Sequence, residues 1–186
     1  MKVVFILGPQ AVGKMTIGEA LSKKMNVPLL FNHMTLDIIH PFIGWGPDTF
    51  RISQMIRSEL FETIAKNDEN PGIIMTMLMF FDHQPDWDIL NSYIKTFEQY
   101  NREVCIVELE AQLDERLRRN STENRLAKKP TKRDLGFSKK ELLHANEKHR
   151  LNSNPEEVAH LNYFKIDVTT LTPEEVCEKI VSHFGL

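Results

Sequence analysis

The sequence has 186 residues, a formal net charge of −3, and hydrophobic and charged fractions of 41% and 26%. These values are typical of an ordinary soluble protein, and the length suits one compact domain with a substantial core. No apolar run reaches the ~18 residues of a membrane span, so we expect none. No repeat or linker divides the chain, so we expect a single domain over residues 1–186.

Charge is unevenly distributed along the chain. Between Arg116 and Arg150 lie 12 of the 23 Lys and Arg residues but only 4 of the 26 Asp and Glu residues. Such a basic segment indicates a local polyanionic partner, and a solvated loop and helix is the alternative. No helix-turn-helix, zinc pattern or aromatic-rich RNA motif accompanies it, so we expect no nucleic-acid partner.

Short apolar runs alternate with helical periodicity along the chain. Strands are predicted at residues 2–7, 28–32, 73–81, 103–108 and 163–167. Helices are predicted at residues 14–25, 48–67 and 86–100, and as starting near residues 113, 138, 154 and 172. This order predicts an α/β fold of three layers, with a five-stranded parallel sheet and helices on both faces.

Three of the helix starts carry capping signals. Ser138 and Glu141 have the spacing of a capping box. Asn154 and Thr172 are each followed by a proline and two acidic residues, which suits a cap and the first turn of a helix.

The stretch LGPQAVGKMT, at residues 7–16, lies between the first predicted strand and the first predicted helix. It has the pattern Gly-x-x-x-x-Gly-Lys of a phosphate-binding loop, with Gly8 and Gly13 as the glycines and Lys14 as the lysine. The general motif continues with Ser or Thr, but here Met15 follows and the hydroxyl arrives at Thr16. Backbone N–H groups and the helix N-terminus would bind phosphate, and a glycine-rich turn is the alternative.

The loop GPQAVGKMT resembles that of adenylate kinase-like enzymes, Gly-Pro-Pro-Gly-x-Gly-Lys-Gly-Thr, in which the residue after the lysine also lacks a hydroxyl. The similarity extends to shikimate and gluconate kinases, and it implies the P-loop NTPase fold. It also implies that Thr16 lies near the phosphates and that Mg²⁺ is held largely through waters and phosphates. The residues expected to bind ATP are Gly8, Pro9, Gln10, Ala11, Val12, Gly13, Lys14, Met15 and Thr16.

The basic segment falls where adenylate kinase-like enzymes have a mobile lid over ATP, so we expect a small lid insertion at residues 114–136. By this resemblance Arg116 and Arg119 pack on adenine and touch the phosphates. Arg125 would add transition-state charge, because the transferred phosphoryl group spreads negative charge over its oxygens. A solvated basic helix and loop is the alternative.

Asp82 directly follows the predicted strand at residues 73–81 and is expected near the phosphates, since ligands gather at the carboxyl ends of parallel strands. It would orient magnesium-bound water or take the acceptor's proton. The family has an acid near this point in the stretch Asp-Gly-Phe-Pro-Arg, whereas this chain has DHQPD. A role as a helix cap or turn residue is the alternative.

The acceptor-binding region is expected at about residues 32–67. Shikimate and gluconate kinases have acids just after the second strand, where this chain has an Asn, a His and, four residues on, an Asp. Arginines on the next helix suit a phosphate or carboxylate group, with surface salt bridges as the alternative. The aromatic segment at residues 40–50 would line a pocket or cover the core. The candidate acceptor residues are Asn32, His33, Asp37, Arg51 and Arg57.

Together these features predict an ATP-dependent phosphotransferase that uses Mg²⁺ and a small-molecule or nucleotide acceptor. A nucleotide-binding regulatory NTPase without such an acceptor is the alternative. The chain is expected to be a monomer or weak homodimer without membrane partners. Cys105 and Cys177 lie far apart in apolar surroundings, which favours reduced thiols and a cytoplasmic location.

Overall fold

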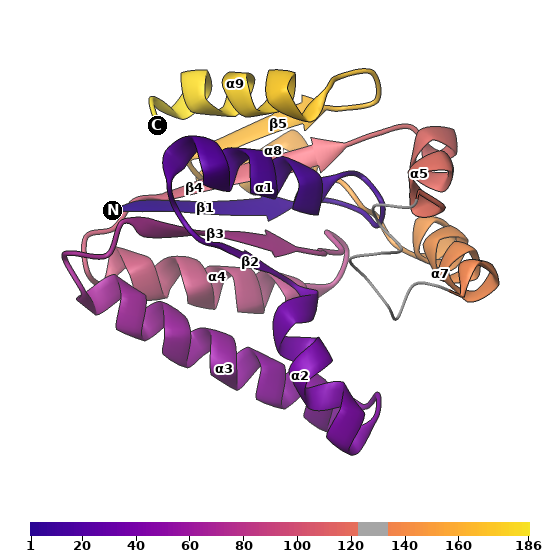
Figure 1. Cartoon of the computed structure of the whole chain (residues 1–186), viewed down its shortest axis with the longest axis horizontal. Helices are drawn as coiled ribbons and strands as arrows, with labels where there is room; N and C mark the ends of the chain where they lie inside the picture. The colour runs from indigo at the N-terminus through magenta and orange to yellow at the C-terminus, as the bar shows by residue number, and fades with distance from the viewer. Residues whose placement is uncertain (123–133) are drawn as a thin grey trace.

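The structure, a computed structural model, describes residues 1–122 and 134–186. Their centre is a parallel sheet of five strands in the order β2-β3-β1-β4-β5 (Figure 1). The strands are β1 (Lys2–Leu7), β2 (Leu29–Phe31), β3 (Gly72–Met77), β4 (Val104–Glu110) and β5 (Tyr163–Asp167). The predicted five-stranded parallel sheet is therefore confirmed.

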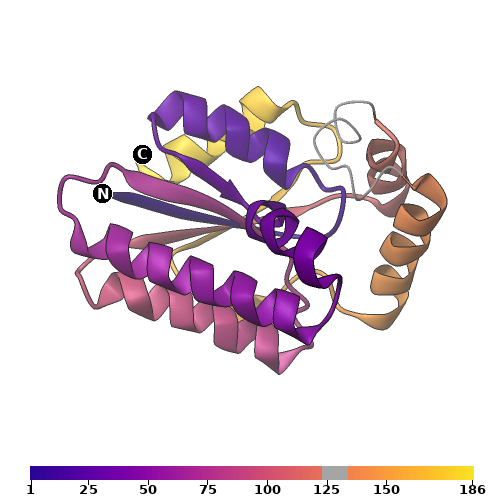
Figure 2. The same cartoon turned by 60° about the horizontal axis from the view of Figure 1, so that its bottom comes forward.

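Helices cover both faces of this sheet, as predicted. Helices α1 (Lys14–Met25) and α9 (Pro173–Phe184) lie on one face, and α3 (Pro47–Lys66) and α4 (Gln84–Glu98) lie on the other (Figures 1 and 2). Three more lie beyond the carboxyl ends of the strands (Figure 1). These are α2 (His33–Ile43), α5 (Leu113–Asn120) and α7 (Leu135–Lys148), while α8 (Pro155–Val158) precedes β5. None of the helices in the described residues has the length and apolar character needed to cross a bilayer.

Side chains of β1 alternate between two hydrophobic clusters, one on each face of the sheet. Phe5 packs in the cluster of α3 and α4, where its ring lies 5.8 Å from that of Phe61 and 6.1 Å from that of Phe97. Val4 and Ile6 are fully buried in the cluster of α1 and α9. Burial on both faces explains why the strands read as continuous apolar runs in the sequence.

The two cysteines are buried and form no disulfide. Burial is the main reason that the pKa of Cys105 is raised to about 11, which keeps this thiol protonated and unreactive.

Capping boxes begin two helices where the sequence predicts them. Asn154 with Glu157, and Thr172 with Glu175, each exchange side-chain and backbone hydrogen bonds. The predicted box at Ser138 is wrong, because α7 begins at Leu135 and is capped by Asp134.

Two further details differ from the sequence prediction. Strand β3 ends at Met77, although the apolar run continues to Phe81. The run continues because Met79 and Phe81 are buried in the core as irregular backbone. Helix α2 was not predicted. Pro41 lies in its last turn, where it removes the backbone hydrogen bond to the carbonyl of Asp37.

The pairing of β3 with β1 leaves no room for a side chain at Gly72. This glycine adopts φ 129°, and a Cβ at this position would lie 1.8 Å from the carbonyl oxygen of Lys2. We expect Gly72→Ala to lower the free energy of unfolding by about 3–5 kcal/mol in urea titrations. Gly185→Ala is the matched control: Gly185 also has a positive φ but no atom within 4 Å of the added Cβ, so the loss is about 1 kcal/mol. Equal losses would contradict the steric explanation.

Candidate functional site

The segment between β1 and α1 has the unusual backbone of a phosphate loop. Gly8, Ala11 and Gly13 adopt φ angles of 139°, 60° and 113°. A Cβ on Gly8 would lie 2.5 Å from the carbonyl oxygen of Leu109, so this glycine allows close packing against β4. Ala11 stands where the resembling loops have glycine, and a left-handed conformation costs a non-glycine residue about 1–2 kcal/mol. The loop therefore holds a strained conformation that its surroundings must stabilise.

The side chain of Lys14 folds back over the start of the loop. Its Nζ donates hydrogen bonds to the carbonyl oxygens of Gly8 at 2.5 Å and Pro9 at 2.7 Å. Two arginines of α5 bind the carbonyl oxygens of Gln10 and Val12 in the same loop. Arg116 Nε donates to Gln10 O at 3.1 Å.

Arg119 completes this set, since its Nη1 donates to Val12 O at 2.7 Å. With the Arg116 bond to Gln10 O, the carbonyls of residues 8, 9, 10 and 12 are all bound by cationic side chains. Because a trans peptide is planar, the N–H groups of Ala11 and Gly13 point away from these arginines. Helix α1 begins directly afterwards with no side-chain cap and no acidic residue in its first turn. The arrangement suits an anion.

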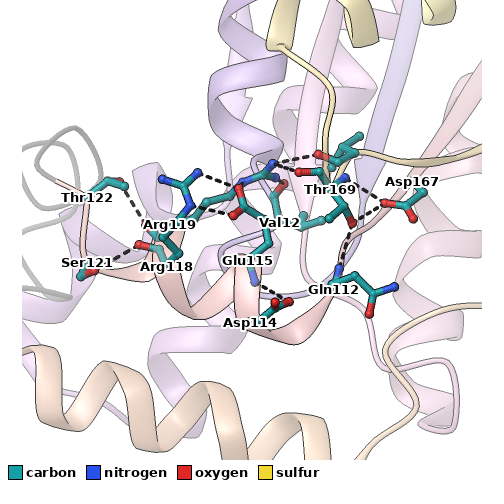
Figure 3. Close-up of polar contacts among 11 residues, drawn as sticks. Val12, Gln112, Asp114, Glu115, Arg118, Arg119, Ser121, Thr122, Asp167 and Thr169 are labelled. Atoms are coloured by element: carbon teal, nitrogen blue, oxygen red, sulfur yellow. Dashed lines mark hydrogen bonds and ion pairs between the residues drawn. The ribbon is translucent and has the colours of Figure 1, made fainter.

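Arg119 also joins two segments far apart in the sequence, as Figure 3 shows. Its Nη2 donates to Val168 O at 2.8 Å, just after β5, and its Nε donates to Glu115 Oε1 at 2.7 Å. Arg118 forms two further hydrogen bonds with Glu115, both of 2.7 Å. These bonds lower the pKa of Glu115 to about 2. The hydrogen bond from Arg118 is the main cause, and the hydrogen bond from Arg119 adds to it.

Arg116 lies behind the loop, with 3% of its surface exposed. Its Nη1 donates to Asn146 Oδ1 at 3.0 Å, and within the described residues its Nη2 has no hydrogen-bond partner. Burial lowers the pKa of Arg116 to about 10. The structure thus places Arg116 as a support of the phosphate loop and not on the cavity in front of it.

A cavity of about 580 Å³ opens in front of the phosphate loop. Residues 10–16 form its floor, including Met15 and Thr16. The rest of its lining comes from the ends of β2 and β3, from α2 and α3, and from α5 and α7. These residues are Asn32, His33, Leu36, Trp45, Phe50, Thr76, Leu78, Arg119, Thr122, Phe137 and Glu141. A volume of this size is typical of small-molecule sites.

The structure divides the candidate acceptor residues into two groups. Asn32 and His33 line the cavity, and Asp37 lies behind His33, with 3.7 Å between Asp37 Oδ1 and His33 Nδ1. Arg51 does not line the cavity, because it is exposed and pairs with Asp48 at 3.1 Å on its own helix.

Arg57 is buried and holds the cavity wall from behind. Its Nη2 donates to Asn32 O at 2.7 Å and to Thr35 Oγ1 at 2.9 Å. The backbone N–H of Asn32 donates to Thr76 Oγ1 at 3.2 Å, which ties the end of β2 to β3. Burial lowers the pKa of Arg57 against the opposing influence of Tyr93. This arginine therefore positions Asn32 instead of reaching an acceptor.

Asp82 does not come together with the phosphate loop. The expectation that it directly follows the third strand is wrong, because β3 ends at Met77, and Asp82 lies outside the cavity lining. Its carboxylate is partly exposed and lies 3.5 Å from His149. Arg125 falls in residues 123–133, outside the described part of the chain, as does the central part of the expected lid.

Several cavity residues had little signal in the sequence. Trp45 and Phe50 belong to the aromatic segment at residues 40–50, for which a pocket was one of two predictions. Phe137 and Glu141 come from α7, about 120 residues after the loop that they face. In the described residues, no group of three or more His, Cys, Asp or Glu side chains could hold a metal ion.

The tie between Glu115 and two arginines predicts a pH-dependent contribution to stability. We expect Glu115→Gln to lower the free energy of unfolding by about 1–3 kcal/mol at pH 7, since charge-assisted hydrogen bonds are lost. Because the pKa of Glu115 is depressed in the folded state, its contribution is present above the ordinary pKa of about 4.5 and is lost as pH falls toward 2. The difference between variant and wild type should therefore shrink below pH 4.5 in urea titrations.

The control for this prediction is Glu178→Gln, at an exposed position of α9. It should leave stability unchanged across the same pH range. A gap between Glu115→Gln and wild type that stays constant from pH 7 to pH 3.5 would contradict the assigned role.

Comparison with known proteins gives no match to a protein-family model or to a curated protein sequence. Solved structures do match over nearly the whole chain. A gluconokinase from Sinorhizobium meliloti 1021 matches with a TM-score of 0.61 at 10% identity, covering 99% of this chain and 91% of its own. A shikimate kinase from Acinetobacter baumannii, in complex with shikimate, matches with a TM-score of 0.61 at 13% identity, covering 99% and 93%.

The APS kinase CysC of Mycobacterium tuberculosis, in complex with AMPPNP and APS, has a TM-score of 0.62 at 12% identity. The match covers 100% of this chain and 98% of the kinase. These identities are low, so the similarity concerns the fold. The strand order, the loop between β1 and α1 and these matches agree that the chain has the fold of the P-loop kinases.

Proposed function

We propose that the protein is an ATP-dependent phosphotransferase that moves the γ-phosphate of ATP to a small-molecule acceptor. The observation that carries this proposal is the phosphate loop, whose carbonyls are bound by Lys14, Arg116 and Arg119 while the loop forms the floor of a cavity. The cavity extends beyond the loop to the ends of β2 and β3, which leaves room for a second molecule.

The phosphate chain of ATP would lie on residues 10–16, against the N-terminus of α1. Lys14 is the cation nearest the loop carbonyls and would move to the β- and γ-phosphates on binding. Magnesium fits this site through the hydroxyl of Thr16, phosphate oxygens and waters, because Mg²⁺ commonly keeps several waters beside a few protein oxygens. When bound, it would neutralise charge on the transferred phosphoryl group.

The acceptor hydroxyl must lose a proton during transfer. His33 lines the cavity, and Asp37 lies 3.7 Å from its Nδ1, so the other ring nitrogen is the candidate to take that proton. We assign the base to His33, positioned by Asp37, in place of Asp82, which lies outside the cavity lining.

A regulatory NTPase is the weaker alternative, because it would not need the part of the cavity that extends to Trp45 and Phe50. The kinase neighbours whose names include shikimate or APS are consistent with a small-molecule acceptor. We further propose a cytoplasmic location, supported by the buried free thiols, and a monomer or weak homodimer that acts without membrane or nucleic-acid partners.

The first test of this function is removal of the loop lysine. We expect Lys14→Ala to reduce acceptor-dependent ADP formation by at least about 100-fold, since a cation that stabilises the transferred phosphate is lost. Lys23→Ala is the control, because Lys23 is an exposed lysine on the same helix. Calorimetry with Mg²⁺ and ATP, together with circular dichroism, separates loss of binding from loss of folding. Full activity of folded Lys14→Ala would contradict the proposal.

The second test concerns the proton acceptor. With an acceptor identified by ADP release, we expect His33→Gln to lower kcat by about 100-fold while the KM for ATP stays unchanged. Asp37→Asn should lower kcat less, because it removes only the positioning carboxylate. His160→Gln, at an exposed histidine outside the cavity, should match wild type. A wild-type kcat for His33→Gln would exclude His33 as the base.

A further inference from the structure

We propose that the phosphate acceptor is an uncharged compound with a flat aromatic ring and a free hydroxyl group, held by Trp45 and Phe50. This inference rests on the proposed function and names the class of its substrate. It follows from the shape, the apolar character and the charge of the part of the cavity next to β2 and β3.

Trp45 and Phe50, here called the aromatic wall, lie at the junction of α2 and α3. Both line the cavity, yet 50% of Trp45 and 56% of Phe50 remain exposed. Their ring centroids are 6.3 Å apart, and the ring centroid of His40 lies 4.3 Å from that of Trp45, so the indole also packs against an imidazole. Large aromatic side chains exposed inside a cavity indicate an apolar ligand that covers them.

Other apolar side chains extend this surface around the cavity. Leu36 contributes from α2, Leu78 from the segment just after β3, and Phe137 from α7. A ring in this part of the cavity would therefore meet apolar groups from several elements. Aromatic contacts of this kind stabilise a bound ring beyond the effect of the area that they bury.

The charges of the cavity lining disfavour an anionic acceptor. Among the described lining residues the only lysine and arginine are Lys14 and Arg119, and both are bound to the phosphate loop. Arg51 and Arg57, which would suit a phosphate or carboxylate group, do not line the cavity, whereas the carboxylate residue Glu141 does. A buried anion without a paired cation is costly, so the described part of the lining favours an uncharged acceptor over a nucleotide monophosphate or a sugar acid.

Polar groups that can bind a hydroxyl line the same cavity. They are Asn32 and His33, which follow β2, and Thr76 in β3. In the proposed step the acceptor's oxygen forms a bond to the γ-phosphorus while the bond from that phosphorus to the β–γ bridging oxygen breaks. ADP leaves with the bridging oxygen, and the hydroxyl proton passes to His33.

The first experiment compares acceptors that differ in one charged group. Uridine is paired with UMP, and 1-phenylethane-1,2-diol is paired with mandelate, with shikimate and gluconate as further anions. ADP formation from ATP is measured with each at equal concentration. We expect the better uncharged aromatic compound to raise the rate at least tenfold above the rate without acceptor and above its anionic partner. A higher rate with UMP, mandelate, shikimate or gluconate would overturn the proposal.

The second experiment removes the aromatic wall. We expect Trp45→Ala and Phe50→Ala each to raise the KM for the uncharged acceptor at least tenfold and to leave the KM for ATP unchanged. Phe42→Ala is the matched control, because Phe42 is an aromatic residue of the same region that is 85% exposed and does not line the cavity. A raised KM for ATP in the two wall variants would assign the wall to the adenine ring and overturn the proposal.

Direct binding separates this proposal from the proposed function. Calorimetry is done with AMPPNP and Mg²⁺, and separately with uridine and phenylethanediol, in wild type and Trp45→Ala. Uptake of AMPPNP without binding of either uncharged compound overturns the acceptor class and leaves phosphotransfer standing. Binding of an uncharged compound that depends on Trp45, without uptake of AMPPNP, overturns phosphotransfer and supports the ligand class.

Discussion

The candidate site depends on how the carbonyl groups of the phosphate loop are bound. A loop can present its N–H groups to an anion only when the carbonyl groups of the same peptides face elsewhere. Arg116 and Arg119 bind two of these carbonyls, and Lys14 binds two more. The strain of Ala11, with its φ of 60°, is stabilised within the same arrangement. The polarity and the conformation of the loop thus depend on one set of hydrogen bonds.

The acceptor side of the cavity depends on a second buried arginine. Arg57 has no carboxylate partner among the described residues, and it donates instead to the backbone of Asn32 and the hydroxyl of Thr35. These bonds connect α3 to the start of α2 just where β2 ends. Trp45 follows the other end of α2 and Phe50 lies near the start of α3, so the contact between these two helices bears on the position of the aromatic wall. Arg57 is thus a positioning residue that lies behind the cavity lining and does not belong to it.

Sequence could predict those features that depend on neighbouring residues. The phosphate loop follows from glycine spacing, and the helix starts at Asn154 and Thr172 follow from a cap residue with a proline and two acidic residues after it, so both could be predicted. The end of β3 could not be predicted, because the apolar run continues beyond it as buried irregular chain. The start of α7 could not be predicted, because Asp134 is as good a cap as Ser138. The cavity beyond the loop was predictable only in part. The sequence predicts that Arg57 binds the substrate. Only its hydrogen bond to the carbonyl oxygen of Asn32 shows that it lies behind the cavity lining.

The contacts of Arg119 have a consequence for local motion. This one side chain connects the phosphate loop, α5 and the segment that begins at Val168. Local opening of any one of the three breaks hydrogen bonds shared with the others, so they form one cooperative unit. A nucleotide that binds the loop would therefore slow amide hydrogen exchange after β5 as well, at residues that it does not touch.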